Sequence, residues 1–253
     1  MLASGGERSF VSDGGHPTSG ACAVSGGRRF RLVLLDAVGT LIRLREPVGE
    51  TYARIAREHG VAIPAWRLDD AFRRVLHGAP PMSSRDDDAE RAWWRDVVRA
   101  TFRAADQMQR FADFEACFAT LFAHFARGDA WQAALGAREA LAALRSEGRR
   151  IAVASNFDHR LPAILAALDL ARELDATWLP RDAGTAKPDP AFFARACERF
   201  GVAPREAVAV GDDPEHDLAA ARRAGLAAID VAALASLAEL PARIAAAESQ
   251  ETE

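Results

Sequence analysis

The strongest constraint on the fold comes from the second half of the sequence, where short apolar runs alternate with stretches of helical periodicity. The spacing predicts strands near residues 150–156, 175–180, 207–213 and 226–231. Between them it predicts helices, each with an apolar stripe along one side. Strands that alternate with helices in this way form a parallel sheet with helices on both faces. We therefore expect an α/β fold.

One further strand stands apart from this alternation. The sequence "FRLVLLD" at residues 30–36 is a continuous apolar run, which is typical of a strand buried on both faces of a parallel sheet. From about Val48 onward the pattern predicts only helices, whose aromatic residues recur at the spacing of a helical-bundle core. We therefore expect an α/β core formed by residues 29–44 and 128–253, with a helical insertion at residues 45–127 after its first strand.

The charge and hydrophobicity of the chain limit the kinds of partner that we expect it to bind. The 253 residues carry a formal charge of −4 and 49% of them are hydrophobic, so a large core can form and wholesale disorder is excluded. A mildly negative chain has no electrostatic footprint for nucleic acid or an anionic membrane. No run approaches the roughly 18 apolar residues of a membrane-spanning helix. We expect neither nucleic acid nor a membrane as a partner, and the sequence does not indicate an oligomeric state.

The cysteines and the N-terminal segment indicate a cytoplasmic protein. Cys22, Cys117 and Cys197 are far apart and form no C-x-x-C pair, so the sequence predicts neither a disulfide framework nor a zinc site. Reduced thiols are typical of the cytoplasm. Residues 1–28 are rich in Gly and Ser and lack the apolar centre of a signal peptide. We expect this segment to be a flexible tail that contributes nothing to folding.

Polar side chains follow the expected strands at the point where each strand ends. They are Asp36 after the first strand, Ser155 and Asn156 after the second, Lys187 in the loop after the third, and Asp212, Asp213 and Asp217 after the fourth. In an open parallel sheet, ligands bind outside the carboxyl ends of the strands, so these side chains are expected to meet at one edge. Each alone is more often a helix cap or a turn residue. Their joint occurrence at successive strand ends favours a binding or catalytic site.

This set of side chains suits phosphoryl transfer. A carboxylate can attack phosphorus and form an aspartyl phosphate. Other carboxylates can hold Mg²⁺, a hard cation that prefers oxygen ligands. The metal ion and a lysine offset charge on the phosphoryl oxygens, while a hydroxyl and backbone N–H groups orient them.

Four motifs in this order resemble the haloacid dehalogenase (HAD) superfamily of hydrolases, over roughly residues 31–230. They are "DAVGT" at 36–40, Ser155 in "ASNFD", Lys187 in "KPDP" and "GDDPEHD" at 211–217. The stretches "LIRLREPVGETYARIAREHG", "RAWWRDVV" and "SNFDHRL" are similar to one subgroup of the superfamily. The resemblance implies a Rossmann-like sheet, with the insertion at residues 45–127 as a helical cap.

The resemblance also implies roles for individual residues. Asp36 would be the nucleophile, and Lys187 would balance charge in the active site. The implied ligands of Mg²⁺ are Asp36, the backbone carbonyl of Val38, Asp212 and Asp217. The implied substrate-binding residues are Thr40, Ser155 and Asn156. The expected substrate is a small phosphorylated metabolite.

Val38 departs from the usual phosphatase motif of the superfamily, D-x-D-x-T. The second Asp of that motif protonates the leaving group, and loss of a positioned general acid typically costs about 10²–10⁴-fold in rate. "DAVGT" also resembles the motif of the superfamily's 2-haloacid dehalogenases, in which the position of Asp212 is usually not acidic. The sequence therefore favours a Mg²⁺-dependent phosphatase. It leaves two alternatives, a non-catalytic protein that binds phosphate or a partner, and a 2-haloacid dehalogenase.

Other side chains are candidates for the missing acid or for contact with the substrate. His216 and His159 could replace the acid–base, although a surface histidine is the commoner interpretation of each. Four residues in or near the cap are candidates for substrate contact: Arg43, Arg45, Tyr52 and Trp93. Arg43 and Arg45 are the stronger candidates because they directly follow the first strand.

Overall fold

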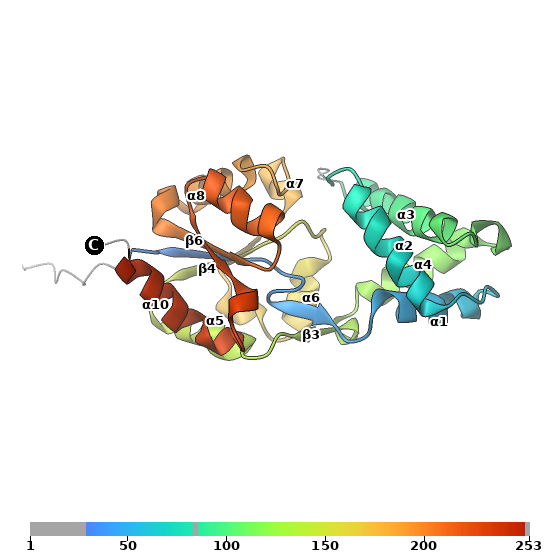
Figure 1. Cartoon of the computed structure of the whole chain (residues 1–253), viewed down its shortest axis with the longest axis horizontal. Coiled ribbons are helices and arrows are strands. Elements are labelled where there is room, and N and C mark those ends of the chain that lie inside the picture. The colour runs from blue at the N-terminus through green and yellow to red at the C-terminus, as the bar shows by residue number, and fades with distance from the viewer. Residues whose placement is uncertain (1–28, 83–85, 251–253) are drawn as a thin grey trace, which may run out of the picture.

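The computed structural model describes residues 29–82 and 86–250, which fold into two parts (Figure 1). The predicted tail at residues 1–28 lies outside the described residues. One part is an α/β sheet layered with helices, and the other is a bundle of helices at one end of it. Within the described ranges, no helix is both long and apolar enough to span a membrane.

The core contains a parallel sheet of five strands in the order β5-β4-β1-β6-β7. These are β1 (Leu32–Leu35), β4 (Arg150–Ala154), β5 (Ala176–Trp178), β6 (Ala207–Gly211) and β7 (Ala227–Asp230). All their pairings are parallel, which confirms the predicted α/β fold. Leu35 pairs with Val153 on one side and with Val210 on the other, so β1 ends level with both neighbours. The residues that follow β1, β4 and β6 therefore emerge at one edge of the sheet.

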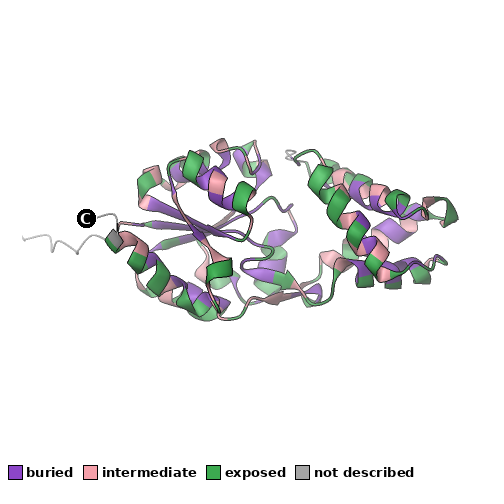
Figure 2. Ribbon diagram, in the orientation of Figure 1, coloured by how far each residue is buried: buried purple, intermediate pink, exposed green. Residues whose placement is uncertain are grey.

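Alternate residues of β1 face opposite layers of helices. Val33 and Leu35 pack against the first layer, whereas Leu32 and Leu34 pack against the second. Figure 2 shows that the strands between the layers are buried, which explains why they read as unbroken apolar runs. The first layer contains α5 (Ala137–Ser146), α6 (Leu161–Ala167) and α10 (Leu240–Gln250), and the second contains α7 (Pro180–Ala183), α8 (Ala191–Phe200) and α9 (Ala220–Arg223).

Short helical turns join these elements and lead into several of the longer helices. The turn that precedes α9 is a π-helix, and the other turns are 3₁₀-helices. They are η1 (Met108–Arg110), η2 (Gly128–Ala130), η3 (Ala171–Glu173), η4 (Pro204–Glu206), η5 (Pro214–Ala219), η6 (Val231–Ala233) and η7 (Leu237–Glu239).

A two-stranded antiparallel ribbon joins the core to the helical part. Its strands are β2 (Ile42–Leu44), which follows β1, and β3 (Trp131–Ala133), which precedes α5. Arg43 lies opposite Gln132 in this ribbon, so the chain enters and leaves the helical part side by side. Because the ribbon brackets residues 45–127, we propose that these residues form a cap over the core.

The cap is a bundle built from α1 (Val48–Glu58), α2 (Ala65–Gly78), α3 (Asp87–Ala104) and α4 (Phe114–Phe125). The Asp113 side chain caps α4 by accepting a hydrogen bond from Ala116 N. The apolar faces of the helices bury an aromatic cluster in which the rings of Tyr52 and Phe102 stack with their centroids 5.8 Å apart. Part of the aromatic content of the cap therefore forms the bundle core that its spacing predicts.

Candidate active site

Asp36 stands at the edge of the sheet because the buried strand β1 ends there. Its backbone N–H donates a hydrogen bond to Val210 O at 2.8 Å, which extends the pairing with β6 by one residue. Burial leaves only 9% of Asp36 exposed. The chain then turns through Gly39, whose φ of +98° is a conformation that favours glycine. A Cβ at this position would lie 2.3 Å from the Asp212 carboxylate, so Gly39 lets that carboxylate approach the turn.

Lys187 joins two carboxylates that come from distant parts of the sequence. Its Nζ donates to Asp36 Oδ1 at 2.6 Å and to Asp217 Oδ1 at 2.5 Å. Lys187 and Asp217 are 4% and 3% exposed, so the three groups form a buried charge network. Removal of one partner from such a network is strongly destabilising, because it leaves an uncompensated buried charge.

Burial and neighbouring charges set the protonation of this network. Burial, opposed by Lys187 and helped by the charge of Asp217, raises the pKa of Asp36 to about 6. Burial lowers the pKa of Lys187, but the two carboxylates outweigh it and hold that pKa above its usual value. Lys187 is therefore a fixed cation, whereas Asp36 exchanges its proton near pH 6.

Three carboxylates form a group that fits a hard metal ion. Oxygens of Asp36, Asp212 and Asp217 all lie within 4.8 Å of one another. Thr40 Oγ1 donates to Asp212 Oδ1 at 3.2 Å and so orients this carboxylate. Oxygen donors of this kind suit Mg²⁺ better than a soft metal. These side chains therefore fit the ion that the motifs imply, while the part of the Val38 carbonyl stays a prediction.

Thr40, Ser155 and Asn156, the predicted substrate-binding residues, lie at the same edge but differ in their contacts. Ser155 follows β4 and is buried. Asn156 Nδ2 donates to Lys187 O at 2.8 Å, and Lys187 N donates to Asn156 Oδ1 at 2.9 Å. Asn156 therefore fixes the backbone that carries Lys187, in the way that Thr40 fixes Asp212. Ser155 and Asn156 line the cavity described next, whereas Thr40 does not. Contact of these three residues with a substrate stays a prediction.

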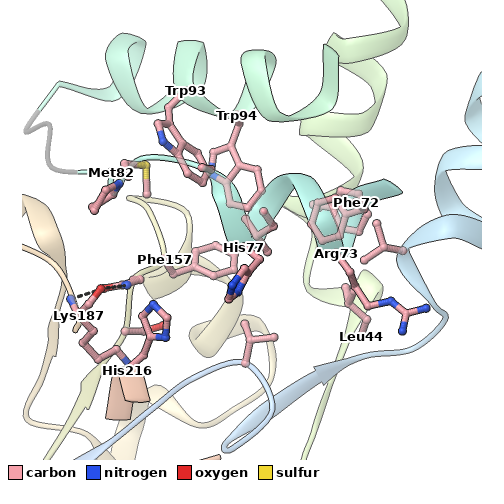
Figure 3. A pocket seen from close by; sticks show the side chains of 18 of the residues that line it. Leu44, Phe72, Arg73, His77, Met82, Trp93, Trp94, Phe157, Lys187 and His216 are labelled. Atoms are coloured by element: carbon pink, nitrogen blue, oxygen red, sulfur yellow. Dashed lines mark hydrogen bonds between the residues drawn. The ribbon is translucent and has the colours of Figure 1, made fainter. Parts of the chain in front are cut away.

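A cavity of about 570 Å³ lies between the core and the cap. Its core end is lined by the predicted site residues Asp36, Val38, Ser155, Asn156, Lys187, Asp212 and Asp217. Its cap end is lined mainly by aromatic and aliphatic side chains from α1 to α4. Figure 3 shows Trp93 and Trp94 on the cap side of the cavity and Lys187 and His216 on the core side. The cavity therefore has a charged end and an apolar end.

The two histidine candidates for the missing acid separate clearly. Val38 is 40% exposed and lines the cavity, so its apolar side chain occupies the place at which the usual motif carries an acid. His216 also lines the cavity, with Nδ1 3.2 Å from Asp213 Oδ1. His159 does not line it. Of the two, only His216 is placed to reach a bound substrate.

The candidates for substrate contact divide in the opposite way to the expectation. Tyr52 and Trp93 line the cavity, whereas Arg43 and Arg45 do not. The preference for the two arginines is wrong because Arg43 lies in the connecting ribbon and both side chains are exposed. Tyr52 and Trp93, which lie on cap helices, line the cavity where the two arginines were expected.

A second polar cluster, here named the latch, joins the cap to the core. It consists of Asp87 and Glu90 from α3, His159 from the loop after β4, and Arg181 from α7. Glu90 is 2% exposed, and its Oε2 lies 2.6 Å from His159 Nδ1 and accepts a hydrogen bond from His159 N at 3.1 Å. Arg181 Nη1 donates to Asp87 Oδ1 at 2.6 Å. Because Arg181 brings a cation to these acids, the latch is an ion-pair contact between the cap and the core.

Several residues of the cavity lining and of the latch were not predicted from the sequence. Trp94 lines the cavity beside Trp93, and adjacent positions on a helix point about 100° apart. Two neighbouring indoles therefore cannot both face one bundle core, which is a signal that the sequence contains. His77, which lines the cavity from α2, and the latch residues Glu90 and Arg181 carry no such signal.

Comparison with known proteins identifies the family. The sequence profile described as haloacid dehalogenase-like hydrolase matches residues 30–225. The chain belongs to the haloacid dehalogenase-like hydrolase family. This HAD-like chain is 38% identical over 193 residues to the Mus musculus protein named "Haloacid dehalogenase-like hydrolase domain-containing protein 3", a match that covers 73% of this chain and 74% of the relative. It is 35% identical over 202 residues to the Homo sapiens protein of the same name, covering 78% and 80%. The narrower likeness seen in the sequence is to this group.

Solved structures share the fold of this HAD-like chain. A structure described as that of a dehalogenase matches with a TM-score of 0.60 and 24% identity, over 82% of this chain and 87% of the other. A HAD phosphatase from Thermococcus onnurineus matches with a TM-score of 0.57 and 21% identity, over 83% and 96%. At such identities the likeness shows the fold alone. The choice between the two chemistries therefore depends on the site residues.

Proposed function

We propose that this HAD-like hydrolase is a Mg²⁺-dependent phosphatase that acts on a small phosphorylated metabolite through an aspartyl-phosphate intermediate. The observation that carries the proposal is the buried network in which Lys187 binds Asp36 and Asp217 at the charged end of the cavity. A nucleophilic carboxylate beside a fixed cation and further carboxylates is the arrangement that phosphoryl transfer uses.

Asp36 is the proposed nucleophile. One of its carboxylate oxygens forms a bond to phosphorus while the bond from phosphorus to the leaving oxygen breaks, and the electron pair stays on the leaving oxygen. A proton from solvent then completes the alcohol product. Water forms a bond to phosphorus while the bond from phosphorus to the Asp36 oxygen breaks, which releases inorganic phosphate, returns one proton to solvent and restores the carboxylate. Since the pKa of Asp36 is about 6, most of this carboxyl is ionised and ready to attack at pH 7.5.

Asp36, Asp212 and Asp217 are the side chains that would hold Mg²⁺, which when bound offsets negative charge on the phosphoryl group. The chain prepares these carboxylates in advance. Thr40 orients Asp212, and Gly39 leaves the room that Asp212 needs. Lys187 supplies a second positive charge that does not depend on metal binding.

Val38 supports a second candidate function, a non-catalytic protein that binds a phosphate group or a partner. The exposed valine offers no proton to a leaving group, and a related fold can retain binding without catalysis. His216 is the side chain of the cavity that could replace the acid. We place the phosphatase first because the nucleophile, the lysine and the metal group are all present together.

A panel of acyl, aryl and alkyl phosphates, assayed with and without Mg²⁺, tests the proposal. A phosphatase should hydrolyse some members only with Mg²⁺, and Asp36→Asn should hydrolyse none. If no member is hydrolysed but Mg²⁺ with a phosphate analogue raises the melting temperature, the protein is a binding protein. Release of halide from 2-haloacids in the presence of a chelator would identify a dehalogenase instead.

We also propose that the protein works in the cytoplasm, with a small phosphorylated molecule as its partner and without nucleic acid or a membrane. The mildly negative charge supports this setting. Cys117 and Cys197 are free and buried, which suits a reducing compartment.

A further inference from the structure

We propose that the natural substrates are aryl phosphate monoesters, in which the leaving group is a hydrophobic aromatic alcohol. This inference rests on the proposed phosphatase function for its hydrolysis step, and it adds the chemical class of the substrate. Two observations carry it independently. One is the wall of the cap end of the cavity, and the other is Val38 at the charged end.

The wall of the cap end offers almost no polar partner. Every described cap residue that lines the cavity is apolar or aromatic, apart from Arg73 and His77. Arg73 is exposed and already occupied, since its Nη2 donates to Asp70 Oδ1 at 3.1 Å and its Nε donates to Asp69 O at 3.3 Å. His77 is exposed near the end of α2. Besides these two side chains, the hydroxyl of Tyr52 is a polar group on a lining side chain, so the wall has few polar groups among many apolar ones.

Arg160, from the loop after β4, also lines the cavity, and its charge is neutralised by Asp158. Its Nε and Nη2 donate to the two carboxylate oxygens of Asp158 at 2.8 and 2.5 Å. Its guanidinium lies 3.9 Å from the centroid of the Phe122 ring, over the ring face. Arg160 therefore packs as part of the aromatic wall and does not present a free cation to an acidic substrate.

An apolar wall selects against polar leaving groups. A sugar, a glycerol or an amino acid would bring several hydroxyl or charged groups into this end of the cavity, where they would lose water and meet few polar partners. An aromatic ring meets the opposite situation. Trp93 and Trp94 pack edge to face with centroids 4.9 Å apart, and both line the cavity. Aromatic rings favour such faces and edges in addition to the burial of their apolar surface.

The size of the cavity agrees with this class. Sites for small ligands typically enclose about 300–1,000 Å³, and this cavity encloses about 570 Å³. That volume holds a phosphoryl group at the charged end together with a one- or two-ring alcohol at the apolar end.

Val38 also favours aryl phosphates as substrates, because it affects how the bond to the leaving group breaks. A leaving alcohol of low basicity departs as an anion without a proton from the enzyme, whereas an alkyl alcohol needs a general acid. Phenols are far weaker bases than alkyl alcohols once ionised. Because Val38 cannot supply a proton, the site suits a phenolic oxygen, and the apolar end of the same cavity suits the aromatic ring attached to that oxygen.

Binding of two non-hydrolysable phosphonates tests the inference apart from turnover. The probes are 2-naphthylmethylphosphonate and methylphosphonate, titrated calorimetrically into the full chain with Mg²⁺. We expect the naphthyl compound to bind at least about ten-fold more tightly, which is the discrimination that a small difference in apolar contact supplies. Equal dissociation constants would overturn the inference and leave the phosphatase proposal standing. Failure of both phosphonates to bind would overturn the phosphatase proposal as well.

Turnover of matched phosphates, compared in two tryptophan variants, completes the test. Acetyl phosphate has a weakly basic leaving group without a ring. The ratio of kcat/KM for 2-naphthyl phosphate to that for acetyl phosphate is compared between a variant and the parent protein, because the difference in leaving-group basicity then cancels and the contribution of the aromatic wall remains. Trp93→Ala should lower this ratio at least about five-fold. Trp66→Ala is the control, since Trp66 lies in the cap, is 68% exposed and does not line the cavity. An unchanged ratio in Trp93→Ala, or a preference of the parent protein for glycerol phosphate, would overturn the inference.

A second variant covers the case in which Trp93→Ala does not fold. Leu76 lines the cavity from α2 and is 38% exposed, so Leu76→Gln places an amide in the wall with little effect on packing. This variant should lower the same ratio. An unchanged ratio in Leu76→Gln would equally count against aryl phosphates as the substrate class.

Discussion

The two ends of the cavity are built in opposite ways. At the core end, Asp36, Lys187 and Asp217 are buried and held to one another by hydrogen bonds within 2.6 Å. At the cap end, aromatic side chains from four helices form a wall whose shape decides what fits. Under the proposed function, the core end determines which bond is broken and the cap end determines which molecule carries that bond. Substitutions at the two ends should then affect reaction and selectivity separately.

Asp36→Asn should produce the largest effect, because it removes the proposed nucleophile at the core end. We expect turnover of every phosphate to fall by at least about 10³-fold, since groups that form a covalent intermediate are not replaced by their neighbours. Initial rates on an aryl phosphate with Mg²⁺ measure the loss. Asp96→Asn is the matched control, as Asp96 is an exposed residue of α3. Residual activity in Asp36→Asn above one part in ten would remove Asp36 from the nucleophilic role.

Val38→Asp should change the core end in the other direction. The new carboxylate would supply the missing general acid, so turnover of alkyl phosphates should rise by up to about 10²–10⁴-fold. Repulsion between the new charge and Asp36 works against the full gain. Rates on alkyl phosphates should rise more than rates on aryl phosphates, because aryl leaving groups need little protonation. Asp36→Asn in the same background should erase the gain.

If Val38→Asp folds and binds Mg²⁺ but hydrolyses no phosphate faster than the parent, the absence of an acid at position 38 does not limit the rate. His216 would then be the next residue to replace, because it lines the same end of the cavity.

Glu90→Gln tests the connection between the two ends. Glu90 is buried in the latch against His159, so loss of its charge should lower the free energy of unfolding by roughly 1–3 kcal/mol. Urea unfolding measures the change. Glu50→Gln, at an exposed position of α1, is the control and should stay within about 0.5 kcal/mol of the parent. Equal stability of the two variants would show that the latch contributes nothing to the docking of the cap.

The pH dependence of Mg²⁺ binding should give the smallest effect. The folded protein raises the pKa of Asp36 from 3.8 to about 6, so protons compete with the metal below pH 6. In the metal-free protein this carboxyl stabilises the fold below pH 3.8, and the contribution is lost as the pH rises through about 6. Mg²⁺ should therefore raise the melting temperature more at pH 7.5 than at pH 5. Asp212→Asn should show no shift at either pH, and an equal shift at both pH values would contradict the assignment of Asp36 as a ligand.

The positions of several core-end residues, though not their roles, could be predicted from the sequence. Parallel strands end at one edge of a sheet, so the residues that follow them along the chain are neighbours in space. Asp36, Ser155, Lys187 and Asp212 all line the cavity for this reason. The contacts of Thr40 and Asn156 were beyond that rule. A hydroxyl or an amide at a strand end can turn to a ligand or to a neighbour, and only the orientation of the side chain decides.

The cap end and the latch could not be predicted in the same way. Aromatic residues at helical spacing suit a bundle core and a cavity wall equally, and the placement of the whole bundle decides which face each ring meets. Phe102 is fully buried in the bundle, whereas Trp93 lines the cavity, although both lie on α3. Glu90 and Arg181 read as ordinary charges on helices. Their contact depends on how the connecting ribbon sets the cap against the core.

The residue at the centre of the buried network also gives the protein a built-in chemical handle. Lys187 is the single lysine among the 253 residues, because every other strongly basic side chain is an arginine. Reagents that modify amines, such as formaldehyde with a mild reductant, therefore have one side chain to modify besides the N-terminal amine. Burial in the folded protein should slow that reaction, and each opening of the site should speed it. An isotope-labelled methyl group placed on this nitrogen would report by NMR on events beside Asp36, without any residue being changed to introduce the probe.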